Sequence, residues 1–136
     1  MPHVSSQISD LESIGPLLDV VISPGKSALG VLGPTTRKAV ALIDTGAVCT
    51  VVKTGIAAAL GLKPIGGVYI NTPSSTQHFC YEYAARILFP NQVVVDQVVI
   101  EAPLKDQPID CLIGRDILRH GIFVYVGPQN SFTLSF

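Results

Sequence analysis

Apolar residues occur along the chain in short runs, some alternating with polar residues and some continuous. Valine, isoleucine, threonine and aromatic residues are frequent in these runs, and 12 glycines and 10 prolines separate them. This pattern is typical of a closed or sandwiched β fold. It predicts strands at Leu17–Ile22, Ala39–Ile43, Gly67–Asn71, Gln77–Phe89, Val93–Ile100, Asp110–Ile113, Ile122–Val126 and Ser131–Phe136.

Two short helices interrupt the predicted strands. One is expected at Gly55–Leu60, with Thr54 as its N-cap and a glycine after its last residue. The other is expected at Asp116–His120, which a glycine also follows. Residues 1–15 carry no strong pattern, so we expect a weakly ordered arm or a strand that a second copy of the chain holds in place.

Length and charge narrow the class of protein. The 136 residues suffice for one domain, which we assign to residues 16–136. Charged residues make up only 14% and the net charge is −1, so the surface favours self-association. The nine basic residues form no run longer than the pair Arg37–Lys38, which argues against nucleic acid as a partner. The apolar runs are too short for a membrane span.

The cysteines and histidines give no metal signature. The three cysteines are widely spaced without a C-x-x-C pair, and the three histidines share no ligand spacing. We therefore expect no metal or other cofactor, and we interpret the cysteines as reduced thiols in a cytoplasmic protein. The N-terminal stretch also lacks the basic and apolar segments of a secretory signal.

One apolar run ends in an acid. The strand Ala39–Ile43 leads directly into Asp44, followed by Thr45 and Gly46. The glycine permits a tight turn or a close backbone approach. A second apolar stretch, Cys111–Ile113, ends in another glycine 70 positions after the acid, and a short helix is predicted next. A carboxylate at the end of a strand and on a sharp turn is held in a fixed direction.

These two motifs identify a resemblance. "LIDTGA" at 42–47, "LIGRDIL" at 112–118 and the terminal "FTLSF" resemble the retropepsins, single-domain aspartic proteases of retroviruses and their cellular and bacterial relatives. The resemblance covers about residues 16–136. It implies an all-β, closed-barrel acid protease half-fold with one or two short helices that works as a homodimer.

Several roles follow from the resemblance alone. Asp44 is then the catalytic aspartate, Thr45 bonds across to the partner subunit, and Gly46 allows close approach. Ile113 and Gly114 match the strand behind the catalytic turn, and Arg115 opens the following helix. The hairpin near Gly67–Phe79 occupies the place of the flap, and Phe132–Phe136 match the strand of the dimer interface. The residues expected to contact a peptide are Leu42, Ala47, Val48, Ile70, Asn71, Thr72 and Ile113.

The family's chemistry explains an acid at the end of an apolar strand. One copy of the motif supplies one carboxylate, so Asp44 of two chains must meet. Two like charges about 3 Å apart cannot both ionise, so the pair shares a proton and activates a water. Ala47 has no hydroxyl to stabilise the ionised pair, which predicts activity at mildly acidic pH, roughly 4 to 6.5.

The chain also departs from the retroviral pattern. Val48 and Cys49 stand where retroviral enzymes usually have acidic residues that hold the arginine of the second motif. Arg115 therefore needs another partner, for which Asp116, Asp110 and a carboxylate of the partner subunit are candidates. The apolar replacement predicts an apolar subsite.

Two functions remain open from the sequence. The first is an aspartic endopeptidase that cleaves extended peptides with apolar flanking residues at an Asp44 dyad. The second is a non-catalytic domain of the same fold that binds peptides or serves as a scaffold. The intact Thr45 and Gly46 favour the first, because a scaffold would not need them.

Overall fold

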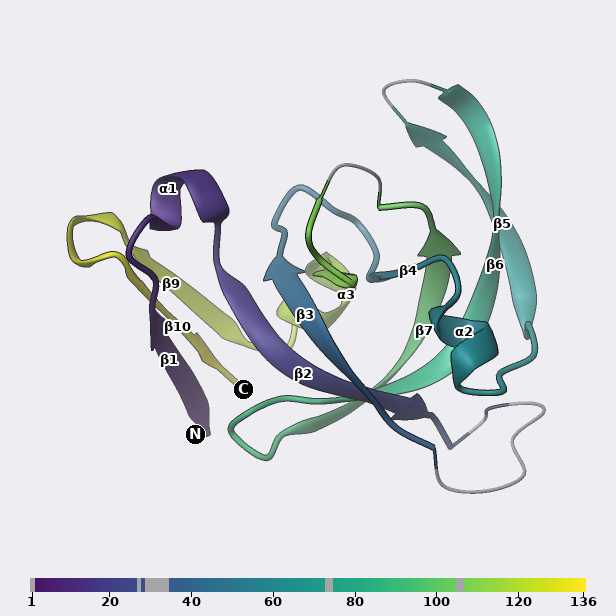
Figure 1. Ribbon diagram of the computed structural model, residues 1–136, viewed down its shortest axis with the longest axis horizontal. Helices are drawn as coiled ribbons and strands as arrows, with labels where there is room; N and C mark the ends of the chain where they lie inside the picture. Colours follow the sequence, from purple (N-terminus) through teal and green to yellow (C-terminus); the bar gives the residue numbers. More distant parts are fainter. Residues whose placement is uncertain (1, 27, 29–34, 73–74, 105–106) are drawn as a thin grey trace.

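The computed structural model describes residues 2–26, 28, 35–72, 75–104 and 107–136. The chain is mostly β, with short helices between the strands (Figure 1). The strands are β1 (His3–Gln7), β2 (Leu17–Pro24), β3 (Arg37–Ile43), β4 (Val51–Lys53), β5 (Gly66–Thr72), β6 (Ser75–Leu88), β7 (Val94–Ala102), β8 (Cys111–Ile113), β9 (Ile122–Val126) and β10 (Ser131–Ser135). The helices are α1 (Leu11–Ile14), α2 (Ile56–Ala59), α3 (Arg115–Leu118) and the 3₁₀ turn η1 (Gly127–Gln129).

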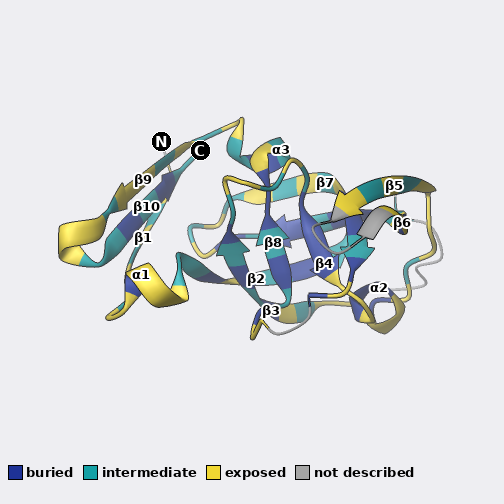
Figure 2. Ribbon diagram, turned by 90° about the horizontal axis from the view of Figure 1, so that it is seen from above, coloured by how far each residue is buried: buried dark blue, intermediate teal, exposed yellow. Residues whose placement is uncertain are grey.

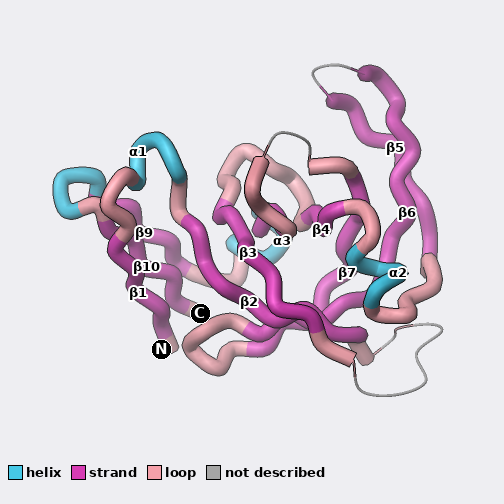
Figure 3. The backbone as a smooth tube through the Cα atoms, in the orientation of Figure 1, coloured by secondary structure: helices cyan, strands magenta, loops and turns pink. Residues whose placement is uncertain are grey.

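The larger sheet closes on itself. Its strands lie in the order β2-β3-β8-β4-β7-β6-β5, and β2 also pairs with β6. The first six strands of that order therefore form a closed barrel, and β5 remains at the edge. The β5–β6 hairpin stands away from the barrel (Figure 3). The expected all-β barrel is thus present, and closure leaves few strand edges unpaired.

Two parallel pairings bring distant parts of the chain together. β3 pairs in parallel with β8, which places Ile43 beside Ile113. β4 pairs in parallel with β7 and antiparallel with β8. Parallel neighbours need long connections, and between β3 and β8 the chain forms β4, the β5–β6 hairpin and β7. As a result, the ends of β3 and β8 lie side by side.

Apolar side chains form two clusters. The larger one includes Ile43, Ile113 and Ile117 and reaches to the smaller sheet. The second lies on the other face of the β3–β8 pair and is centred on Val51 and Ile100. Buried residues concentrate on the barrel strands in Figure 2. Alternation along β3 and β8 assigns successive residues to the two clusters.

The N-terminal segment has more structure than the sequence indicated. β1 pairs with β10 over its whole length, and β10 pairs with β9, in a three-stranded sheet. α1 follows, and its Leu11 is buried in the larger cluster. Residues 1–15 were expected to be weakly ordered or held by a second copy. In the structure, strand pairing within the chain and burial of Leu11 hold residues 3–14 instead.

The helices differ from the expectation in detail. The N-cap of α2 is Gly55, which has a left-handed backbone and no side chain to cap the helix, so Thr54 is not the N-cap. The carboxylate of Glu101 instead accepts hydrogen bonds from the Gly55 and Ala57 amides. α3 begins at Arg115, one residue before the predicted start. α1 and the short strand β4 were not predicted.

Phe132 tests the packing of the smaller sheet onto the barrel. Its side chain is 0% exposed, and its ring centroid lies 6.1 Å from that of Phe123. Phe132→Ala should lower the free energy of unfolding by about 3–5 kcal/mol because it leaves a cavity. Thr133→Ala, on the exposed side of the same strand, should cost about 1 kcal/mol or less. Urea unfolding of both variants measures the difference, and equal losses would contradict this packing.

Candidate active site

The turn after β3 holds Asp44 in a defined orientation. The Asp44 amide donates to the carbonyl of Ile113 at 3.0 Å, which ties the turn to β8. The Gly46 amide donates to Asp44 Oδ1 at 2.9 Å, and the Ala47 amide donates to the Asp44 carbonyl at 3.2 Å. Asp44 is half-buried, whereas Thr45 and Gly46 are exposed. In the single chain the acid therefore lies at an open surface and is not enclosed by the core.

Gly114 is the point of closest backbone contact between the two motifs. A Cβ at this position would lie 2.5 Å from both the carbonyl carbon and the carbonyl oxygen of Cys49. Backbone atoms cannot move aside as a flexible side chain can. Only glycine therefore allows β8 to pass this closely behind the loop that follows Asp44.

A buried hydrogen-bond network joins the same two motifs. Thr50 is 0% exposed, and its hydroxyl donates to Asp116 Oδ1 at 2.7 Å and accepts from the Gly114 amide at 3.1 Å. Its amide donates to Asp116 Oδ2 at 2.9 Å. The Ile117 amide also donates to Asp116 Oδ1, at 2.8 Å. Charge-assisted bonds of this kind are among the stronger ones, so Asp116 fixes α3 against the loop that follows Asp44.

Arg115 has a partner that the sequence analysis did not consider. Its guanidinium Nη1 donates to the carbonyl oxygen of Thr45 at 2.7 Å. The expected carboxylates serve elsewhere: Asp116 binds Thr50, and Asp110 accepts from the Val40 amide and lies 3.9 Å from Arg37. Arg115 therefore supports the backbone of the turn from outside, and its amide donates to the Ala47 carbonyl at 2.9 Å.

The two faces of β3 and β8 separate site residues from core residues. Leu42 pairs with Leu112, and both are half-buried against the second cluster, which also includes Ile70 of β5. Ile113 is 0% exposed within the larger cluster on the opposite face. The expectation that Ile113 contacts a peptide is therefore wrong, because strand alternation turns it into the core. Leu112 occupies the corresponding position on the open face.

The loop after the acid presents small apolar residues. Val48 is 71% exposed, an unusual state for valine, and Ala47 is half-buried beside it. Cys49 is half-buried against the second cluster. The loop therefore presents an apolar surface, and its use as a substrate subsite stays a prediction.

The β5–β6 hairpin spans the expected flap position, and its residues 73–74 lie outside the described residues. Asn71 Oδ1 accepts a hydrogen bond from the Gln77 amide at 3.2 Å. Gln77 has a positive φ of 60° at a register shift in the strand pair. Asn71, expected to contact substrate, thus stabilises this irregularity in the hairpin. Thr72 ends β5 opposite Ser75.

The outer face of the hairpin carries an aromatic strip made of Tyr69, Phe79 and Tyr81. The ring of Phe79 lies 5.3 Å from that of Tyr69 and 5.0 Å from that of Tyr81, both edge to face. All three side chains are exposed. Edge-to-face contacts between rings stabilise neighbouring strands, so the strip stiffens the hairpin.

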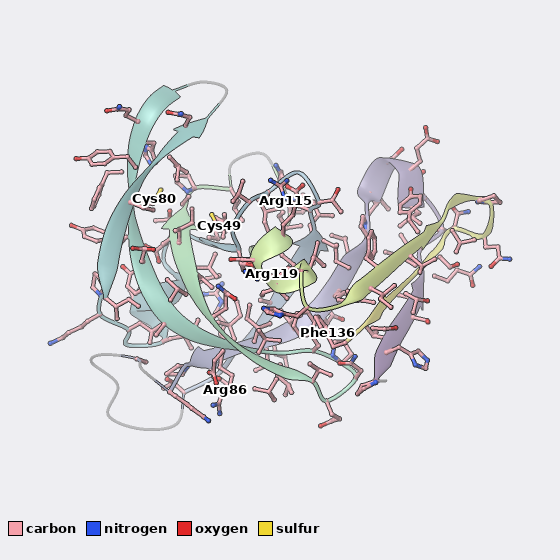
Figure 4. The ribbon with its side chains drawn as sticks, turned by 180° about the vertical axis from the view of Figure 1, so that it is seen from behind. Cys49, Cys80, Arg86, Arg115, Arg119 and Phe136 are labelled. Atoms are coloured by element: carbon pink, nitrogen blue, oxygen red, sulfur yellow. The ribbon has the colours of Figure 1, made fainter. Side chains whose placement is uncertain are left out.

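The cysteines are unpaired thiols with raised pKa values. Burial, together with Asp116, Cys80 and Glu82, raises the pKa of Cys49. Burial also raises the pKa of Cys80, and it raises that of Cys111 to about 12 with help from Asp110 and Asp116. Figure 4 shows Cys49, on the loop that follows Asp44, near Cys80 of β6, and both belong to the second cluster. Such thiols are poor nucleophiles.

The described part of the chain holds no group of three His, Cys, Asp or Glu side chains placed to bind a metal ion. It also contains no helix of the length and apolarity that a membrane span requires.

Sequence reasoning missed two contributors to the site. Thr50 follows the motif by four positions, and only the fold shows that its hydroxyl is buried against Asp116. Leu112 could have been found from spacing, because it precedes Gly114 by two positions, as Leu42 precedes Asp44. Equal spacing along two paired strands places side chains on the same face.

Comparison with known proteins places this geometry in context. Residues 19–117 match a protein family described as aspartyl protease. A retropepsin-like aspartic protease from Rickettsia conorii has a similar solved structure, with 15% sequence identity and a TM-score of 0.51 over 89% of this chain and 93% of that chain. This likeness confirms the expected retropepsin-like fold.

The retroviral protease-like domain of Ddi1 from Leishmania major is 15% identical, with a TM-score of 0.48 over 85% of this chain and 86% of that chain. The comparison with curated proteins gave no match.

Gly114→Ala tests the close contact between β8 and the loop that follows Asp44. The added methyl group would overlap the Cys49 backbone, so the free energy of unfolding should fall by about 3 kcal/mol or more. At Gly127 the nearest atom to a new Cβ is Tyr125 Cε1, at 3.5 Å, so Gly127→Ala is a matched control with ordinary contact. Urea unfolding compares the two. A Gly114→Ala protein as stable as the control would show that the contact is not tight.

Proposed function

The chain belongs to the aspartyl protease family, and from this premise we propose that it is an aspartic endopeptidase whose catalytic dyad forms between Asp44 of two copies. The observation that carries the proposal is the oriented, half-exposed Asp44 at the end of β3. Its neighbours Thr45 and Gly46 are exposed, which leaves room for a second copy of the turn.

A second carboxylate must come from outside the chain. Among the described residues, the Asp44 carboxylate accepts a hydrogen bond from the Gly46 amide, and no second carboxylate bonds to it. Aspartic protease chemistry needs two carboxyl groups that share one proton. A homodimer related by a two-fold axis supplies the second one, since such an interface brings the same residue of each copy together.

The dyad would hydrolyse a peptide bond without a covalent intermediate. The ionised Asp44 removes a proton from a bound water, and that water attacks the scissile carbonyl carbon. The protonated Asp44 of the partner donates to the carbonyl oxygen as it gains negative charge. Asp44 then passes the proton taken from water to the leaving nitrogen as the C–N bond breaks, and the partner's Asp44 recovers its proton from the tetrahedral intermediate, which becomes the new carboxyl group. The Gly46 amide holds the carboxylate in place throughout, which limits reorganisation during the reaction.

The substrate class follows from the open face beside the turn. Leu42, Leu112 and Ile70 lie on the face of the second cluster, and Val48 is exposed next to Asp44. These residues favour apolar side chains around the scissile bond. β5 lies at the edge of the sheet and can offer backbone hydrogen bonds to an extended peptide.

Asp44→Asn tests the dyad directly. The wild-type protein, incubated near pH 5 with a complex peptide library, should cut between apolar residues, and the variant should lose this activity by about a thousandfold or more. Mass spectrometry identifies the cut sites. Asp19→Asn removes an exposed acid outside the turn and should cleave as the wild type does.

Sedimentation analysis of the same samples gives the oligomeric state. A folded wild-type dimer that cuts nothing would refute the endopeptidase proposal and leave the peptide-binding or scaffold role. Equal cleavage by wild type and Asp44→Asn would assign the activity to another group or a contaminant.

Ala47 sets the expected pH range. Activity requires one proton on the dyad, so it should decline where both carboxyls are protonated and where both are ionised, with a maximum at roughly pH 4 to 6.5. Ala47→Ser adds a hydroxyl donor that stabilises the ionised form and should shift the pH–rate profile downward by about half a pH unit. Ala58→Ser, on the exposed side of α2, is the control. A wild-type maximum near pH 2 would refute this prediction.

A further inference from the structure

A row of paired residues crosses the larger sheet from β2 to β5. Each member faces the next across a strand pair, so all of them share one face of the sheet. The row consists of Leu17, Leu42, Leu112, Val51, Ile100, Glu82 and Gly66. The first five members belong to the second apolar cluster. Glu82 is the single charged residue in the row.

Glu82 lies on β6 at the base of the flap, close to the catalytic loop. Its neighbour two residues earlier, Cys80, packs in the second cluster with Cys49. Glu82 also contributes to raising the pKa of the Cys49 thiol, as a nearby negative charge does. The carboxylate therefore faces the same space as the apolar wall beside Asp44.

Gly66 provides room for the Glu82 side chain. A Cβ on Gly66 would lie 2.8 Å from Glu82 Oε1, so the carboxylate lies flat against the backbone of β5. Any other residue at position 66 would displace the carboxylate. The sequence thus places a glycine and an acid at directly paired positions. As a result, the carboxylate lies along β5, the strand that we expect to contact the substrate backbone.

Among the described residues, none is a counterion of the Glu82 carboxylate. Across the described residues, its oxygens take part in no hydrogen bond. The ion pairs there are Arg37 with Asp110 and Arg86 with Asp96, and neither includes Glu82. Glu82 is half-buried, and its row is otherwise apolar. A carboxylate in such surroundings loses hydration, and a cation that arrives with a ligand can offset that loss.

We propose that Glu82 selects a lysine or arginine side chain at one fixed position of the bound peptide. This inference rests on the proposed peptidase function and adds a charged specificity site to a sheet face that is otherwise apolar. The long aliphatic part of lysine or arginine packs along the half-buried Val68 of β5, which pairs with Cys80, while its charged end meets the carboxylate. The preferred substrate thus carries apolar residues around the scissile bond and one basic residue in register with Glu82.

The test compares lysine with norleucine, which has the same unbranched chain without the ammonium group. A synthetic library of apolar peptides carries lysine or norleucine at each position in turn, and kcat/KM is measured for each peptide. The wild type should prefer lysine at one position by about tenfold, the usual effect of a charge-assisted hydrogen bond. Glu82→Gln should reduce this ratio to near one, and Glu82→Lys should favour norleucine. Glu12→Gln, an exposed acid on α1, should keep the wild-type ratio.

A binding experiment separates this inference from the peptidase function. The same library is applied to immobilised Asp44→Asn protein and to Asp44→Asn with Glu82→Gln, and retained peptides are sequenced. If the wild type cuts nothing but Asp44→Asn retains lysine peptides in a Glu82-dependent way, the peptidase proposal fails and the specificity site stands. Cleavage or retention without a lysine preference overturns the role of Glu82. If no peptide is cut and none is retained, both proposals are overturned.

Discussion

The site depends on how closely β8 passes behind the loop that follows Asp44. Gly114 lies against the Cys49 backbone at a distance that admits no side chain. This contact brings the Ile113 carbonyl within reach of the Asp44 amide and the Thr50 hydroxyl within reach of Asp116. Arg115 then reaches the Thr45 carbonyl from the other side. One steric condition therefore sets the position of four residues that hold the turn.

The same arrangement explains why the turn is rigid yet open. Buried and charge-assisted hydrogen bonds fix it from below, where Thr50 and Asp116 meet. Above it, Asp44 is half-buried and Thr45 is exposed. The turn therefore holds its acid in a fixed orientation at an accessible surface, as the proposed dyad of two identical turns requires.

The sequence predicts the architecture well and the individual contacts less well. Strand positions, the barrel and the pairing of the two motifs follow from short apolar runs and from two glycines. From the sequence, Ile113 was expected on the same face as Leu42. In the parallel pair, Leu112 lies beside Leu42 and Ile113 lies beside Ile43, so Ile113 is on the opposite face. The partners of Arg115 and Asn71 are backbone groups, which residue types do not reveal. The position of Glu82 opposite Ile100 depends on the register between β6 and β7, which residue types do not reveal.

The parallel pairing of β3 with β8 has a consequence for the order of events during synthesis. The Asp44 turn needs the Ile113 carbonyl, Gly114 and Arg115, all of which leave the ribosome about 70 residues after it. Contacts between such distant segments form late in folding. A nascent chain that stops before α3 therefore carries the acid on a strand with no support behind it. The turn can therefore assemble only after nearly the whole chain has been synthesised.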